Sequence, residues 1–69
     1  MDISDFMALS PTERLKFAPI IAKYNPAGTS AFETIINIIN RWGFDALRPC
    51  FKISFLLNLA NVPNSEINK

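Results

Sequence analysis

The sequence predicts an all-α fold, a small bundle of three to four short helices that is kinked at Pro19. Two helix-start signals support this fold, because Ser10 and Ser30 are each followed three residues later by a glutamate, the spacing of a capping box. Apolar residues recur at helical spacing after both signals. The sequence holds no second clear strand that could pair with a first one, so a sheet within one chain is not expected.

The amino-terminal third is predicted to hold two helices. Residues 1–9 carry enough apolar side chains for one or two amphipathic turns, which are too short to be stable alone. A longer helix should run over residues 11–24, because Pro11 suits the first position of a helix that Ser10 caps. Pro19 falls inside this helix, where its ring and missing N–H cost ~3 kcal/mol. We therefore expect a kink just before Pro19 or a division into two short helices.

The third helix, which has the clearest pattern, follows a turn at residues 25–29. From Phe32 to Trp42, isoleucines and aromatic residues share one face and polar residues the opposite face. Ser30 should cap its start, and Gly43 stands where a left-handed C-terminal cap belongs. The segment is therefore predicted to be a helix that packs one face on the core.

The fourth helix should span residues 49–60, after a short turn at residues 46–48. Its apolar residues point in nearly all directions, which marks a helix that is buried centrally or faces a partner. One alternative stays open, because residues 51–55 alternate apolar and polar side chains as a strand does. Such a strand would require a partner edge to pair with.

The composition excludes several kinds of chemistry. Without histidine the chain has no Ser-His-Asp triad, no Cys-His dyad and no imidazole metal ligand. Cys50, the single cysteine, cannot form an internal disulfide or a cysteine-rich zinc site, and we expect a buried structural thiol. The carboxylates are scattered, so they are expected to cap helices or face water rather than to form an acid–base pair. We expect no enzymatic activity, no metal and no cofactor.

Charge and hydropathy point to a cytoplasmic protein. The net charge of +1 argues against a DNA mimic and against a strongly basic nucleic-acid coat. Asp2 and Asp5 stand where a secretory signal carries lysine or arginine, and the longest apolar stretch is too short to cross a membrane. We expect one soluble domain over residues 1–63 and a frayed polar tail over residues 64–69.

The chain has more aromatic side chains than so short a domain can easily cover. Six phenylalanines, one tryptophan and one tyrosine occur among 69 residues, and uncovered aromatic surface marks association sites. In one stretch, basic residues lie beside aromatic ones, as in protein interfaces and in single-strand stacking sites. Alternatively, this stretch forms no binding site: its aromatic residues belong to the core and its basic residues face water. The candidate partner-binding residues are Arg41, Trp42, Phe44, Arg48, Phe51, Lys52 and Phe55.

We expect a non-catalytic protein-binding module, a small inhibitor or adaptor that acts stoichiometrically through an apolar, aromatic-rich face. Inhibitors of this size are common in phages and mobile elements, which is a general expectation rather than a property of these residues. Two alternatives are a self-assembling homodimer and a helix-turn-helix-like DNA-binding regulator. Residues 55–65 resemble the first helix and turn of that motif, but a recognition helix starting near Asn64 would have fewer than two turns. A protein partner is therefore favoured over nucleic acid.

Overall fold

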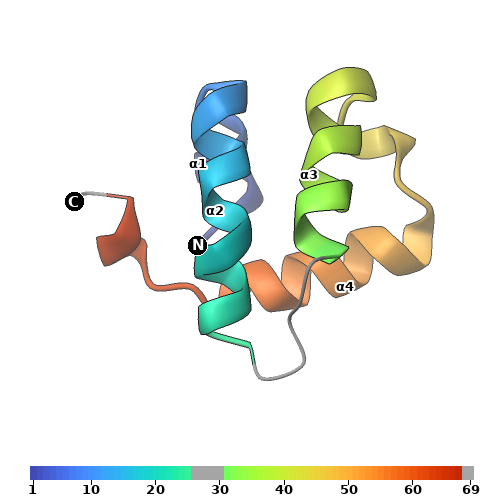
Figure 1. Cartoon of the computed structure of the whole chain (residues 1–69). Helices are drawn as coiled ribbons and strands as arrows, with labels where there is room; N and C mark the ends of the chain where they lie inside the picture. Colours follow the sequence, from blue (N-terminus) through green and yellow to red (C-terminus); the bar gives the residue numbers. More distant parts are fainter. Residues whose placement is uncertain (26–30, 68–69) are drawn as a thin grey trace.

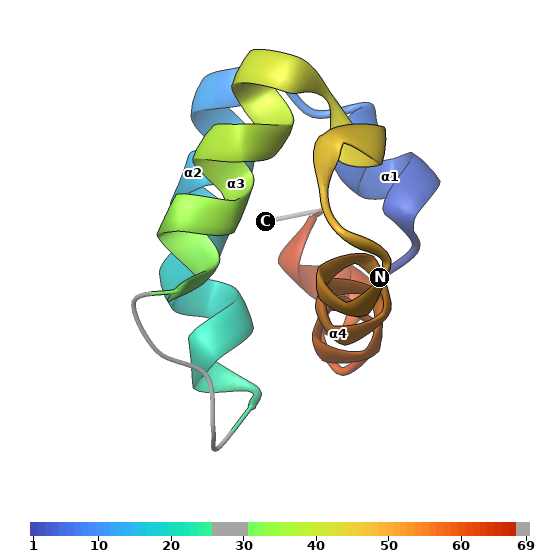
Figure 2. The same cartoon turned by 90° about the vertical axis from the view of Figure 1, so that its right-hand side faces the viewer.

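The computed structural model describes residues 1–25 and 31–67, which form an all-α bundle as predicted (Figure 1). Helices α2 and α3 stand side by side, and α4 crosses beneath both of them. Figure 2, turned by 90°, shows α4 nearly along its axis at the lower edge of the molecule. In chain order the elements are α1 (Ile3–Met7), α2 (Pro11–Lys23), α3 (Ala31–Trp42), the 3₁₀ turn η1 (Phe44–Ala46), α4 (Pro49–Ala60) and the 3₁₀ turn η2 (Asn64–Glu66).

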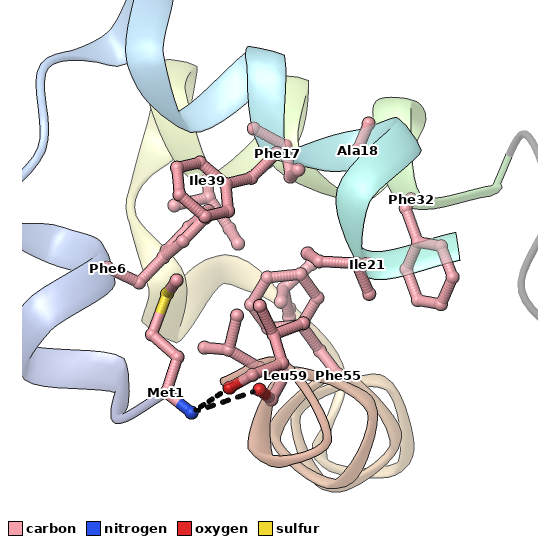
Figure 3. Packing of buried hydrophobic residues seen from close by; sticks show 12 residues of the cluster. Met1, Phe6, Phe17, Ala18, Ile21, Phe32, Ile39, Phe55 and Leu59 are labelled. Carbon is pink, nitrogen blue, oxygen red and sulfur yellow. Dashed lines mark hydrogen bonds between the residues drawn. The ribbon is translucent and has the colours of Figure 1, made fainter. Parts of the chain in front are cut away.

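The core lies between α1, α2, α3 and α4, with Phe6 of α1 fully buried (Figure 3). The rings of Phe17 and Phe55 pack edge-on against Phe6, with centroids 6.4 and 5.4 Å away. Such pairs add about 0.5–1.5 kcal/mol to the effect of burial itself, so tertiary packing stabilises the short α1. The buried apolar residues are Met1, Phe6, Phe17, Ala18, Ile21, Phe32, Ile36, Ile39, Leu47, Phe55, Leu59 and Val62.

The start of α2 confirms the predicted capping box. The Ser10 Oγ accepts a hydrogen bond from the Glu13 backbone N–H at 3.2 Å, and the Ser10 N–H donates to Glu13 Oε1 at 3.4 Å. The second predicted box begins at Ser30, which lies outside the described residues, as does most of the predicted turn before it.

Helix α2 continues through Pro19 and is not divided into two helices, so that alternative is wrong. The proline side chain is exposed, while Phe17, Ala18 and Ile21 around it are buried. Each buried apolar side chain contributes about 1.5–3 kcal/mol, so burial on both sides of the proline offsets its cost of ~3 kcal/mol.

Polar contacts hold α2 against α3. The Arg14 side chain donates to Asn40 Oδ1 at 2.9 Å and to the Met7 carbonyl oxygen at 3.2 Å. The Asn40 amide donates in turn to the Pro11 carbonyl oxygen at 2.9 Å. These bonds connect the start of α2 with the last turns of α3 and so fix the position of the α3 C-terminal end.

Gly43 ends α3 in a conformation that favours glycine. Its N–H donates to the Ile39 carbonyl oxygen at 2.8 Å, and its φ is 96°, but the predicted left-handed cap is not formed. Its ψ of 160° lies outside the left-handed helical region, in one that essentially only glycine populates. The chain therefore turns away from the α3 axis directly after Trp42 and enters η1.

Residues 51–55 are helical and form part of α4, so the strand alternative is wrong. The described residues contain no strand for such a segment to join. Burial of one side of this segment on the core favours the helical period over the alternating one, since Phe55 and Leu59 lie on the same side and are both buried.

Residues 64–67 pack on the domain, and the expectation of a frayed tail is wrong for them. Glu66 of η2 is buried and accepts a hydrogen bond from the Tyr24 hydroxyl at 3.0 Å, and Ile67 packs against the core. The amino nitrogen of Met1 donates to the carbonyl oxygens of Val62 at 2.7 Å and Leu59 at 3.4 Å (Figure 3). One end of the described chain is thus attached near the C-terminal end of α2, and the other near the C-terminal end of α4.

Candidate protein-binding surface

Phe55 belongs to the core and is removed from the candidate surface. Its side chain is fully buried, and its ring lies 5.4 Å from Phe6 and 6.4 Å from Phe44. Sequence alone could not distinguish its side of α4 from the others, because apolar residues occur nearly all round this helix.

Trp42 is exposed at the C-terminal end of α3. The alternative interpretation, in which the aromatic residues are core and form no binding site, is therefore wrong for Trp42. Its side chain is 65% exposed. The Arg41 guanidinium lies 5.0 Å from the centroid of the Trp42 ring, within the range of a cation–π interaction. Arg41 also stands in the last turn of α3, where a cation interacts favourably with the helix dipole. Trp42 is thus a large aromatic side chain presented to solvent beside an exposed positive charge.

Lys52 and Phe44 connect η1 to α4. The Lys52 ammonium lies 3.2 Å from an Asp45 carboxylate oxygen and 5.9 Å from the centroid of the Phe44 ring. Phe44 is partly buried and packs against Phe55 of the core. The positive charge of Lys52 is therefore compensated within the domain, and Phe44 has a structural role.

A shallow apolar groove of about 270 Å³ lies between α3 and the beginning of α4. Phe51 forms one side and stays 48% exposed, while Ile35 and Ile38 form part of the α3 side. The groove is smaller than the 300–1,000 Å³ typical of ligand sites and matches one or two apolar side chains. Its lining residues are Ala31, Thr34, Ile35, Ile38, Leu47 and Phe51.

The side of α3 that borders the groove continues toward Trp42. Ile35, Ile38 and Trp42 are spaced three and four residues apart, so they lie on one side of the helix. The axial distance from Ile35 to Trp42 is about 10 Å at 1.5 Å per residue. We call the residues Ile35, Ile38, Trp42, Leu47 and Phe51 the α3 surface.

Some of the partner-binding residues predicted from the sequence lie in the α3 surface, and others lie beside it. Trp42 and Phe51 belong to the α3 surface, and Arg41 stacks on Trp42 at one end of it. Arg48 is exposed and directly follows Leu47 in the chain. Ile35 and Ile38, which the sequence assigned to the core-facing stripe of the third helix, do pack against the core, but their part in the groove was not predicted. The signal for them was the width of that stripe, which is greater than one packing face can bury.

Sequence reasoning also missed the outer side of α4. Ile53 is 61% and Leu57 66% exposed, and Cys50 is exposed as well, so the expectation of a buried thiol is wrong. Cys50 lies in the first turn of α4, on the side away from the core-facing Phe55. The sequence indicated a helix with too many apolar sides, but it gave no information about which side faces water.

The described residues show no side-chain grouping typical of a metal centre. None of them form a group of three or more histidine, cysteine, aspartate or glutamate side chains that could hold a metal ion. No helix in the described part of the chain has the length and apolarity needed to span a bilayer. The recognition helix considered near Asn64 is not formed, because residues 64–66 make a single 3₁₀ turn that buries Glu66.

No protein family, curated protein or solved structure matches this chain. The exposed apolar side chains and their neighbouring charges are therefore the basis on which a function is proposed.

Proposed function

We propose that this domain is a non-catalytic protein-binding module, an inhibitor or adaptor that acts stoichiometrically through the α3 surface. The observation that carries the proposal is the exposure of two large aromatic side chains, Trp42 at 65% and Phe51 at 48%. Phe51 lines the groove, and Trp42 lies further along the side of α3 that borders it. Exposed aromatic side chains grouped in this way mark sites where association removes apolar surface from water. Tryptophan and arginine are also the residues most often found at the energetic centre of an interface.

The charges near the α3 surface indicate what kind of partner it fits. Arg41 and Arg48 are exposed and take part in no ion pair within the described residues, whereas Lys52 is paired with Asp45. The excess charge beside the α3 surface is therefore positive. We propose a partner segment that presents apolar side chains at helical spacing, with acidic residues next to them, as in the binding of an amphipathic helix to a groove.

Affinity capture with matched variants tests this function. Trp42→Ala and Phe51→Ala each remove an exposed aromatic ring, and truncation at an interface centre costs about 2 kcal/mol or more, which is roughly 30-fold in affinity. We expect a protein captured by the wild-type domain to be lost with both variants. Leu57→Ala removes an equally exposed apolar side chain on another side of the domain and serves as the control.

Two results would contradict the proposal. In the first, Leu57→Ala abolishes capture while Trp42→Ala and Phe51→Ala bind normally, which places the contact elsewhere. In the second, all three variants capture the same proteins as the wild type at equal yield, so that the α3 surface contributes nothing. Circular dichroism of each variant establishes that its helix content is retained.

A further inference from the structure

We infer that the outer side of α4 binds the same side of a second copy of this chain, with the two α4 helices antiparallel. This surface is separate from the α3 surface, so the inference goes beyond the proposed function and does not depend on it. The outer side of α4 consists of Cys50, Ile53, Leu57 and Ala60, with Leu56 at its margin. All five residues are exposed in the described part of the chain, and Figure 2 shows α4 at one edge of the molecule.

The outer side of α4 carries no charge. Lys52 is the one charged residue between Pro49 and Ala60, and it is turned toward Asp45, which it contacts at 3.2 Å. A charged partner would find no opposite charge on this side, whereas a second copy brings an equally uncharged apolar side and no repulsion. The small net charge of +1 per chain adds little repulsion between two copies.

The spacing of the outer residues fits a two-fold antiparallel pair. Cys50, Ile53, Leu57 and Ala60 follow one another at intervals of three, four and three residues, which keeps them on one side of the helix. The same intervals occur when the helix is read backwards. Position 55 is the midpoint of the inner pair, Ile53 and Leu57, and also of the outer pair, Cys50 and Ala60. This is the self-complementarity that an isologous interface requires.

Antiparallel pairing about this midpoint brings matching side chains together. Ile53 of one copy lies opposite Leu57 of the other, which gives two central layers of large aliphatic side chains. Cys50 lies opposite Ala60, which gives two outer layers of small side chains. The helix dipoles are opposed in this arrangement, so the positive end of each helix lies near the negative end of the other.

The size of this surface predicts a weak dimer. Stable interfaces bury about 800 Å² on each partner, whereas α4 has 12 residues and a length of about 18 Å, so one helix side supplies less than that area. We therefore expect a dimer that dissociates on dilution through the micromolar range.

Sedimentation over a concentration series of the full chain, from about 1 µM to about 1 mM, is the first test. The mass should rise from 7.8 kDa toward twice that value. Leu57→Glu places like charges near each other in the pair and should remain monomeric throughout, with unchanged circular dichroism because residue 57 is exposed. Asn37→Glu, which adds the same charge at an exposed position of α3, is the matched control and should dimerise like the wild type. A wild-type mass that stays at 7.8 kDa at every concentration overturns the inference.

Disulfide cross-linking tests the antiparallel orientation. In the proposed pair the two Cys50 residues are about 15 Å apart along the helices, beyond the limit of about 7 Å between Cα atoms for a disulfide. Wild type alone and Cys50→Ser/Ala60→Cys alone should therefore give no cross-linked dimer on oxidation. An equimolar mixture of the two should give one, since Cys50 then meets a cysteine at position 60. Rapid cross-linking of the wild type alone indicates parallel helices and overturns the proposed orientation.

Discussion

At the scale of single residues, Asn25 is the polar side chain on which the joint between α2 and α4 depends. It is buried, and its amide donates to the carbonyl oxygens of Ile21 at 2.7 Å and Asn58 at 2.9 Å. Its Oδ1 accepts from the Asn61 amide at 2.6 Å. One side chain thus connects the last turn of α2 with the C-terminal end of α4, and no apolar residue of that size supplies these bonds.

Replacing Asn25 should destabilise the domain strongly for a single polar side chain. Asn25→Ala removes three hydrogen bonds, of which the one to Ile21 is buried and the other two are part-buried. Partners that can reach water lose only the net contribution of a bond, about 0.5–1.5 kcal/mol each. We expect the free energy of unfolding, measured by urea titration, to fall by about 2–3 kcal/mol. Asn37→Ala, at an exposed position of α3, should change it by less than about 0.5 kcal/mol. An equal effect of the two substitutions would contradict the role of Asn25.

Single residues also show where prediction from sequence reaches its limit. Phe55 and Ile53 are both apolar residues of the same helix, yet Phe55 is fully buried and Ile53 is 61% exposed. A polar stripe normally identifies the wet side of a helix, and α4 has too few polar residues to form one. The candidate site was therefore predicted only in part: Trp42 and Phe51 are exposed, whereas Phe55 is core.

At the scale of elements, local signals predicted α2 well because its start depends on contacts between neighbouring residues. Ser10 and Glu13 form the capping box within four residues of sequence. Whether the helix continues through Pro19 depends instead on burial against distant parts of the chain. Signals from neighbouring residues in the sequence do not include that burial. For the same reason the sequence could not predict that η2 packs on the domain, since Glu66 is held by Tyr24, 42 positions away.

The proline in α2 leads to a prediction of increased stability. Pro19 is exposed and removes one backbone hydrogen bond, so Pro19→Ala can restore that bond without creating a cavity. A more flexible unfolded chain offsets part of the gain, by about 0.4–1 kcal/mol. We expect the free energy of unfolding to rise by about 2 kcal/mol in a urea titration. Lys16→Ala, which is exposed on the same helix, should have little effect. A loss of stability with Pro19→Ala would show that the core requires the backbone geometry that proline imposes.

At the scale of the whole molecule, contacts between distant residues connect the two ends of the described chain. Tyr24 reaches Glu66, and the amino nitrogen of Met1 reaches Val62, 61 positions along the chain. Both contacts join segments that are far apart in the sequence. They can form only when the bundle is packed, and they stabilise that packing in turn.

The Tyr24 contact predicts a lower melting temperature when the phenol is removed. Tyr24→Phe keeps the ring and deletes the hydroxyl that donates to Glu66, which should cost about 1–2 kcal/mol. In a domain of this size each kcal/mol corresponds to about 4–8 °C in Tm, measured by thermal circular dichroism. Ser65→Ala, which changes an exposed side chain in the same 3₁₀ turn, should leave Tm nearly unchanged. An unaltered Tm in Tyr24→Phe would mean that this contact adds nothing to stability.

The packing of Phe6 against Phe55 also determines when α1 can take its place during translation. The ribosome makes α1 first, but its ring acquires a neighbour on α4 only after another 49 residues have been added. At about 5–20 residues per second, that interval lasts about 2–10 seconds, during which Phe6 lacks its contact with α4. Helix α1 is therefore made before the α4 surface on which Phe6 packs, and this contact can form only once α4 is available.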